Sequence, residues 1–119
     1  MKHNNRKTGA QYEQYAGTYL ENQGYYILQY NYRCKKGEID IVARDGEYLV
    51  FCEVKYRAGD AGGHPAEAVD LRKQKRISGC ALYYMMEKGI DDIPCRFDVI
   101  SICGKEIMLI KNAFDYIGG

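Results

Sequence analysis

The sequence predicts an α/β fold, in which one mixed β-sheet is flanked by helices and the elements follow the order αβββαββ. Two stretches have the apolar spacing of amphipathic helices, and five shorter stretches are rich in β-branched and aromatic residues. The second helix separates two groups of strands and is long enough to connect parallel strands. A crossover of that length favours a mixed sheet with helices on both faces.

The 119 residues suit one domain with one core, so residues 1–119 are expected to form a single domain with a loosely held arm at residues 1–7. The net charge is +1, so any binding of nucleic acid needs a local basic patch. No apolar run approaches the roughly 20 residues that span a membrane, and no signal peptide is expected. Five cysteines, an odd number without a C-x-x-C pair, indicate reduced thiols in a cytoplasmic protein.

The two helices have recognisable ends. The first is expected over residues 9–23, with Gly24 as its stop. The second is expected over residues 66–88, beginning after Pro65 and ending at Gly89. Its apolar positions include Val69, Ile77, Ala81, Leu82 and Met85. The strands outside the hairpin are expected over residues 25–30, 95–103 and 106–110, and residues 31–37 are expected to form a basic turn that leads into the hairpin.

Residues 36–57 predict a β-hairpin. Asp45-Gly46 lies between two runs of β-branched and aromatic residues and is a strong signal for a two-residue turn. With that turn, Arg44 pairs with Glu47. One face of the hairpin is then apolar throughout and consists of Ile39, Ile41, Ala43, Tyr48, Val50, Cys52 and Val54. The other face mixes charged residues with large apolar ones: Glu38, Asp40, Val42, Leu49, Phe51, Glu53 and Lys55.

This mixed face is expected to pack partly under a helix, because a solvated face seldom carries three large apolar residues in the middle of a hairpin. Asp40 and Glu53 become diagonal neighbours, roughly 6–8 Å apart at Cβ. Like charges this close raise one another's pKa or recruit a cation, and oxygen ligands without His or Cys suit Mg²⁺ or Mn²⁺. The alternative is a salt-bridged surface in which Lys55 neutralises Glu53. A register slip of one residue would scatter the cluster over both faces.

Several patterns carry a resemblance to a known family. Asp40, twelve intervening residues and then Glu53-Val54-Lys55 resemble the D…E-x-K signature of nucleases. The patterns that match in order are Tyr12-Glu13 with Ala16 and Tyr19-Leu20, Gly24-Tyr25, Asn31-Tyr32-Arg33, Phe51-Cys52-Glu53-Val54-Lys55-Tyr56-Arg57, Pro65 with Ala68-Val69, Lys73 with Arg76-Ile77, and Arg96-Phe97-Asp98-Val99. Over roughly residues 9–103, the set resembles the YraN-type family of small bacterial endonuclease-like proteins. One departure is Cys52, where a Val is more usual.

The resemblance implies a restriction-endonuclease-like fold and kinship with archaeal Holliday junction resolvases. It implies that Glu13, Asp40, Glu53 and Lys55 are the catalytic residues. Asp40 and Glu53 would bind one Mg²⁺ or Mn²⁺, with Glu13 reaching the site directly or through water. Lys55 would orient the attacking water. Glu38 is either a residue that supports the metal ligands or a purely structural one.

Glu13 and the basic cluster of the second helix each have a purely structural explanation as well as a functional one. Glu13 alone would be an acidic residue in the first turn of a helix, where the helix dipole favours it. The second helix carries a local cluster of four cations, Arg72, Lys73, Lys75 and Arg76, and most such clusters are solvated helix faces. Next to an acidic metal site, Lys73, Lys75 and Arg76, together with Arg57, would instead contact backbone phosphates.

The resulting hypothesis is a metal-dependent nuclease that hydrolyses phosphodiester bonds, with DNA, branched DNA included, as the expected substrate. Cutting two strands would favour a homodimer. Two alternatives keep the same fold: a module that binds nucleic acid without cutting it, and a scaffold that contacts DNA repair or processing proteins. An intact set of Asp40, Glu53 and Lys55 favours the enzyme, because a pure binder need not keep an uncompensated acidic cluster.

Overall fold

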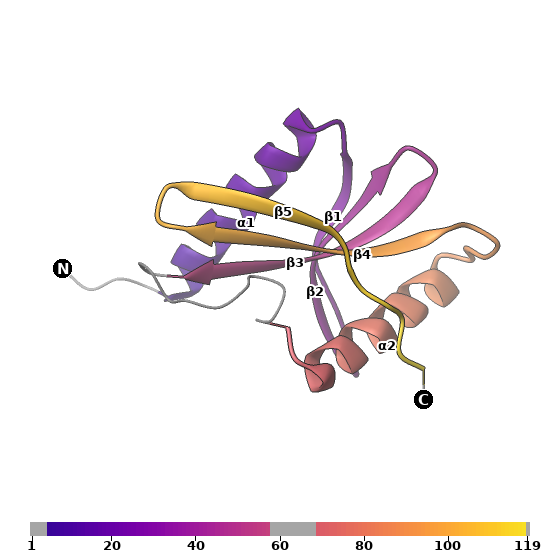
Figure 1. Cartoon of the computed structure of the whole chain (residues 1–119). Helices are drawn as coiled ribbons and strands as arrows, with labels where there is room; N and C mark the ends of the chain where they lie inside the picture. The colour runs from indigo at the N-terminus through magenta and orange to yellow at the C-terminus, as the bar shows by residue number, and fades with distance from the viewer. Residues whose placement is uncertain (1–4, 58–68, 119) are drawn as a thin grey trace.

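The computed structural model describes residues 5–57 and 69–118 of the chain, with side chains from residue 9 onward. The elements are α1 (Asn5–Asn22), β1 (Tyr26–Cys34), β2 (Gly37–Asp45), β3 (Tyr48–Arg57), α2 (Leu71–Glu87), β4 (Cys95–Cys103) and β5 (Glu106–Phe114) (Figure 1). This order confirms the predicted αβββαββ arrangement. Neither described helix has the length and apolar character that crossing a lipid bilayer requires.

The five strands form one mixed sheet in the spatial order β1-β2-β3-β4-β5. β3 and β4 run parallel, and the other neighbouring pairs are antiparallel. The parallel pair requires a crossover, and α2 lies in that connection. Figure 1 shows α1 and α2 on opposite sides of the sheet, so the predicted mixed sheet with a helix on each face is confirmed.

Each face of the sheet has its own apolar core. On one face, buried α2 residues pack with side chains from the mixed face of the hairpin: Ile77, Ala81 and Tyr84 with Val42, Leu49 and Phe51. On the other face, α1 packs with the alternate strand residues: Ala16 and Leu20 with Ile41, Ala43, Val50 and Cys52. The expectation that a helix covers the mixed face is therefore confirmed.

The turn between β2 and β3 differs from the predicted one. It consists of Gly46-Glu47, and Asp45 is the last residue of β2, paired with Tyr48. Arg96 of β4 and Lys111 of β5 form ion pairs with the Asp45 carboxylate, which keep Asp45 in the strand. The register is displaced by two residues, and because side chains alternate with a period of two, the faces of the paired strands are unchanged.

The helix starts also differ from prediction. α2 begins at Leu71, because Asp70 is its N-cap and accepts a hydrogen bond from the Lys73 N–H at 2.9 Å. The expected start near Pro65 lies outside the described residues. α1 begins at Asn5, so residues 5–7 of the expected arm belong to this helix, and residues 1–4 lie outside the described part of the chain.

Two strands are longer than predicted. β1 continues to Cys34 through residues that were expected to form a basic turn, and β5 continues to Phe114. Asn31 interrupts the regular geometry of β1 with a φ of 55°. Its neighbour Tyr32 and the paired Ile39 belong to the core on the α2 face, although Ile39 was expected to share a face with Ile41.

Candidate functional site

The site lies where β2 separates from β3. Paired residues of the two strands end at Ile41 and Cys52, and Asp40 is the next residue of β2. The Val54 N–H donates a hydrogen bond to Asp40 Oδ2 at 2.8 Å, where a continued ladder would offer a backbone carbonyl. The Asp40 carboxylate is therefore fixed between the diverging strands by a main-chain donor.

Three further carboxylates approach Asp40 from separate elements. Carboxylate oxygens of Glu13, Glu38 and Asp40 lie within 4.8 Å of one another. Glu53 of β3 is buried and lines the same hollow as Glu38 and Asp40. We call these four residues the acidic cluster; they are brought together by α1, β2 and β3.

The pKa of Asp40 reflects this environment. Burial is the largest cause that raises it, the Glu53 carboxylate is the next, and together with Glu13 and Glu38 they bring the Asp40 pKa to about 8. The hydrogen bond from Val54 acts in the opposite direction but does not prevail. Because a nearby cation favours the charged form of a carboxyl group, a bound cation would relieve the conditions that keep Asp40 protonated.

Two residues of β1 hold the outer carboxylates. Asn31 Nδ2 donates to Glu13 Oε1 at 2.8 Å, and Asn is among the residues that tolerate the positive φ found there. Arg33 Nε lies 3.5 Å from Glu38 Oε1. The strand next to β2 therefore orients two members of the acidic cluster, and α1 does not position Glu13 alone.

The cation that neutralises Glu53 comes from α2. Lys73 Nζ forms an ion pair with Glu53 Oε2, and Lys73 lies in the first turn of the helix that Asp70 caps. Burial opposes the charge on Lys73, but the hydrogen bond and charge of Glu53 outweigh it and raise the Lys73 pKa. The alternative in which Lys55 neutralises Glu53 is therefore not what the structure shows.

An open hollow of about 470 Å³ lies beside the acidic cluster, between the start of β2 and the first half of α2. We call it the site hollow. Its lining combines three carboxylates with four cations: Glu38, Asp40 and Glu53 with Lys35, Lys36, Lys73 and Arg76. This combination suits a phosphodiester group, because the cations can contact phosphate oxygens and the carboxylates can ligate a metal ion.

Comparison with known proteins identifies the family. Residues 12–102 match the family described as "Uncharacterised protein family UPF0102". The chain belongs to UPF0102. A UPF0102 protein of Lachnoclostridium phytofermentans is 51% identical over 116 residues, covering 97% of this chain and 98% of that protein. A UPF0102 protein of Syntrophus aciditrophicus is 49% identical over 119 residues, covering 97% and 94%. UPF0102 is the YraN family, so the resemblance inferred from the sequence patterns is confirmed.

In this UPF0102 chain, the predicted metal ligands Glu13, Asp40 and Glu53 all belong to the acidic cluster, and so does Glu38. Asp40 interacts electrostatically with each of the other three, and these interactions contribute to its raised pKa. Lys55 follows two residues after Glu53 in a regular part of β3 and therefore shares its face. Among the described residues, no ion pair involves Lys55, so its ammonium group is not engaged by the acidic cluster.

The predicted phosphate contacts separate into two groups. Lys73 and Arg76 line the site hollow, whereas Lys75 lines neighbouring hollows on α2. Arg57 is the last residue of β3 and is not among the residues that line the site hollow. The cluster that the sequence suggested is thus distributed around the helix.

Sequence reasoning missed three contributors to the site in this UPF0102 chain. Lys35 and Lys36 line the site hollow from the turn before β2, and Asn31 holds Glu13. The basic pair immediately before Gly37 was a usable signal, since it precedes the acidic strand directly. Nothing local indicated the role of Asn31, because its partner lies eighteen residues away on α1.

Proposed function

We propose that this protein is a metal-dependent nuclease that hydrolyses phosphodiester bonds in nucleic acid, with DNA as the expected substrate. The observation that carries the proposal is Asp40. Its carboxylate is partly buried, is held by a main-chain N–H and lies among three other carboxylates, and burial together with these charges raises its pKa to about 8. A folded protein that keeps four acidic groups in such an arrangement gains stability when a cation joins them.

The residues present fit a hard divalent cation. The ligands on offer are carboxylate oxygens alone, the donor type that Mg²⁺ and Mn²⁺ prefer. Asp40, Glu53 and Glu13 would hold the ion, with Glu38 supporting them. When bound, the cation would lower the pKa of a water molecule and stabilise negative charge that develops on the phosphate.

The chain's own residues would position the substrate. Arg76 and Lys36 line the site hollow and would contact backbone phosphates without reading sequence. Lys55, which shares a sheet face with Glu53, would orient the attacking water and offset charge. Lys73 would hold Glu53 in place through their ion pair.

The Lys73–Glu53 ion pair also supports a second candidate function. Lys73 already neutralises one of the four carboxylates. The negative charge of the acidic cluster is therefore partly balanced, which the sequence did not indicate. A module of the same fold that binds nucleic acid without cutting it could retain that pair for stability. The two functions assign different roles to Lys55. In a nuclease its ammonium group acts in cleavage, whereas a binding module gives it no such task, and among the described residues it forms no ion pair that would explain it structurally.

The test compares cleavage and binding by wild type and Lys55→Ala on a panel of single-stranded, duplex and branched DNA and RNA. With Mg²⁺ or Mn²⁺, wild type should cleave at least one substrate. Lys55→Ala should cut turnover at least tenfold and leave affinity nearly unchanged, because orientation of a water acts mainly in the transition state. Tight binding by both proteins without any cleavage would establish the binding module instead.

The expected compartment and assembly belong to the same proposal. All five cysteines are free thiols in the structure, which supports work in the reducing environment of the cytoplasm. A homodimer would present two sites to a duplex. Light scattering during the cleavage experiments measures the assembly directly.

A further inference from the structure

A second hollow lies on the outer side of α2, next to the site hollow. It measures about 490 Å³, within the range of roughly 300–1,000 Å³ that is usual for ligand pockets. We call it the α2 hollow. Lys36 and Arg76 line both hollows, so the two are adjacent and share a cationic border.

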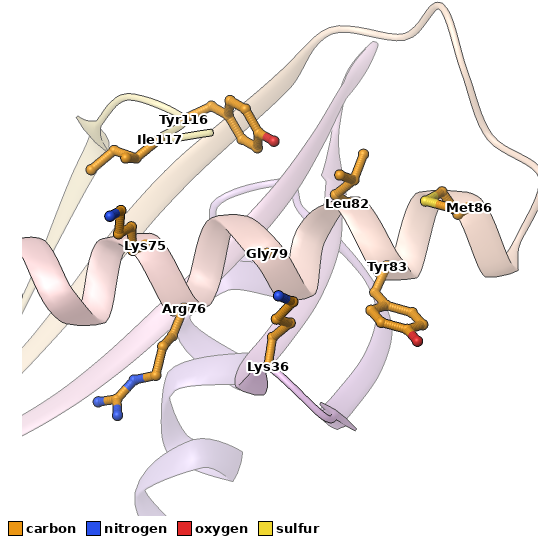
Figure 2. A pocket seen from close by; sticks show the side chains of 9 residues that line it. All are labelled: Lys36, Lys75, Arg76, Gly79, Leu82, Tyr83, Met86, Tyr116 and Ile117. Atoms are coloured by element: carbon orange, nitrogen blue, oxygen red, sulfur yellow. The ribbon is translucent and has the colours of Figure 1, made fainter. Parts of the chain in front are cut away.

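Gly79 forms the floor of the α2 hollow, in the middle of the helix. A Cβ at this position would come within 3.2 Å of Lys36 Cγ, so the glycine lets the Lys36 side chain lie across the helix. Figure 2 shows Gly79 between Lys36 and Tyr83 on one side and Lys75 and Tyr116 on the other. Glycine destabilises a helix interior relative to alanine, and this close packing explains its presence.

The segment after β5 builds one wall of the α2 hollow. The Ile117 N–H donates to the hydroxyl oxygen of the buried Ser78 at 3.0 Å, which anchors the segment to α2. Figure 1 shows this yellow segment crossing the helix. Tyr116 nevertheless stays 53% exposed, so the fold holds an aromatic ring at the rim without burying it.

The lining combines exposed rings with positive charge. Of the eleven large apolar side chains that are exposed in the described residues, four line the α2 hollow: Leu82, Tyr83, Met86 and Tyr116. Three cations accompany them, and none of the nine lining residues is acidic. Aromatic rings beside Lys and Arg are the features that bind unpaired nucleotides, because bases stack on the rings and phosphates contact the cations.

We propose that the α2 hollow binds an unpaired nucleotide of the nucleic acid on which the protein acts. Its base stacks on Tyr83 or Tyr116, and its phosphates contact Lys36, Lys75 and Arg76. The inference rests on the proposed function, because the shared Lys36 and Arg76 would lead the backbone from this hollow to the acidic cluster. It assigns a substrate class: nucleic acid with a looped, single-stranded or branched part beside the bond that is cut.

Fluorescence titration in EDTA tests this site without requiring cleavage. The probe is a DNA stem-loop with 2-aminopurine in the loop, compared with a fully paired duplex of the same length. Wild type should bind the stem-loop several-fold more tightly and quench the loop fluorescence. Tyr83→Ala and Tyr116→Ala together should weaken stem-loop binding roughly tenfold and abolish the quenching, whereas duplex binding changes little. The same stem-loop made of RNA shows which sugar is preferred.

Matched variants separate stacking from folding. Tyr83→Phe with Tyr116→Phe keeps both rings and should restore affinity and quenching. Tyr26→Ala removes a ring that is 70% exposed on β1, away from the α2 hollow, and should behave like wild type. Unchanged quenching in the double alanine variant, or equal affinity of wild type for loop and duplex, would overturn the proposal. So would light scattering that shows a dimer lost only in that variant, since the face would then join two copies of this chain.

The outcome also separates this inference from the proposed nuclease. A protein that cleaves DNA but shows no tyrosine-dependent preference for the loop is a nuclease without this nucleotide site. A protein that prefers the loop through its tyrosines but never cleaves has the nucleotide site, and the nuclease proposal then fails alone.

Discussion

At the scale of single residues, Asp40 is a carboxyl group whose surroundings oppose its charge. Burial and three neighbouring carboxylates oppose its ionisation, and one main-chain hydrogen bond favours it. A free carboxyl group in an unfolded chain has a pKa of about 3.9. The Asp40 carboxyl group, which is ionised in the unfolded chain at neutral pH, therefore takes up a proton on folding when no cation is present.

This difference predicts how stability depends on pH. Because the pKa of Asp40 is higher in the folded state, its neutral form contributes to the free energy of unfolding. This contribution is complete below about pH 4 and is lost as pH rises towards 8, by at most roughly 1.4 kcal/mol per pH unit. Asp40→Asn should keep that stability, so its advantage over wild type should grow between pH 5 and pH 8 in EDTA. Urea unfolding measures it, with the exposed Asp91→Asn as control. Parallel curves for wild type and Asp40→Asn would contradict the description of Asp40.

Lys73 offers a second prediction for a single side chain. Removing its charge in Lys73→Met would leave Glu53, whose side chain is 6% exposed, without its cation. We expect a loss of about 1–3 kcal/mol in the free energy of unfolding, below the value for fully buried pairs because Lys73 is partly exposed. Lys75→Met, two residues further on an exposed position, is the matched control. Equal stability of the two variants would show that the ion pair contributes nothing.

At the scale of elements, the position of α2 decides how the acidic cluster is compensated. Asp70 caps the helix by accepting a hydrogen bond from the Lys73 N–H, so one residue fixes both the start of the helix and the turn that carries Lys73. Asp70→Ala should cost about 1 kcal/mol of stability, whereas Asp70→Asn, which keeps a capping oxygen, should cost less. Denaturant unfolding compares the two variants, and an equal loss from both would rule out the cap.

The hairpin shows what could be predicted from the sequence and why. Its alternation of side chains was sufficient to place Val42, Phe51 and Glu53 on a face covered by a helix. The turn could not be assigned, because Asp45 is held in β2 by Arg96 and Lys111, two contacts that lie far away in the sequence. The register differs from the predicted one by an even number of residues, so each side chain stays on its predicted face. Asp40 and Glu53 were therefore placed near each other although the predicted register was wrong.

Other differences have the same origin in contacts between distant residues. Leu82 fits the apolar spacing of α2 but is 47% exposed, whereas Tyr84 is buried and stacks edge-on with Tyr32 and Phe51. Periodicity identified the helix but not the width of its buried side. The sequence likewise suggested Lys55, the nearest cation along the chain, as the ion-pair partner of Glu53. In the structure the partner is Lys73, which lies on the crossover helix α2.

At the scale of the whole molecule, the near-zero net charge conceals a local concentration of cations beside the acidic cluster. Lys36 and Arg76 border both hollows, so reversing their charge should weaken binding of any sequence and make its salt dependence shallower, by about one unit in slope per lost phosphate contact. Lys105→Glu, at the exposed turn between β4 and β5, is the control. Filter binding between 50 and 300 mM salt measures the slope, and an unchanged slope would make these residues ordinary surface cations.

The binding of a divalent cation by the acidic cluster can be tested before any substrate is known. Calorimetric titration of the full chain with Mn²⁺ at pH 7.5 measures it directly. We expect one site whose binding releases protons, because Asp40 must ionise, and whose affinity falls at least tenfold in Asp40→Asn but not in Asp91→Asn. Equal binding of Mn²⁺ by wild type and Asp40→Asn, or none by either, would contradict it.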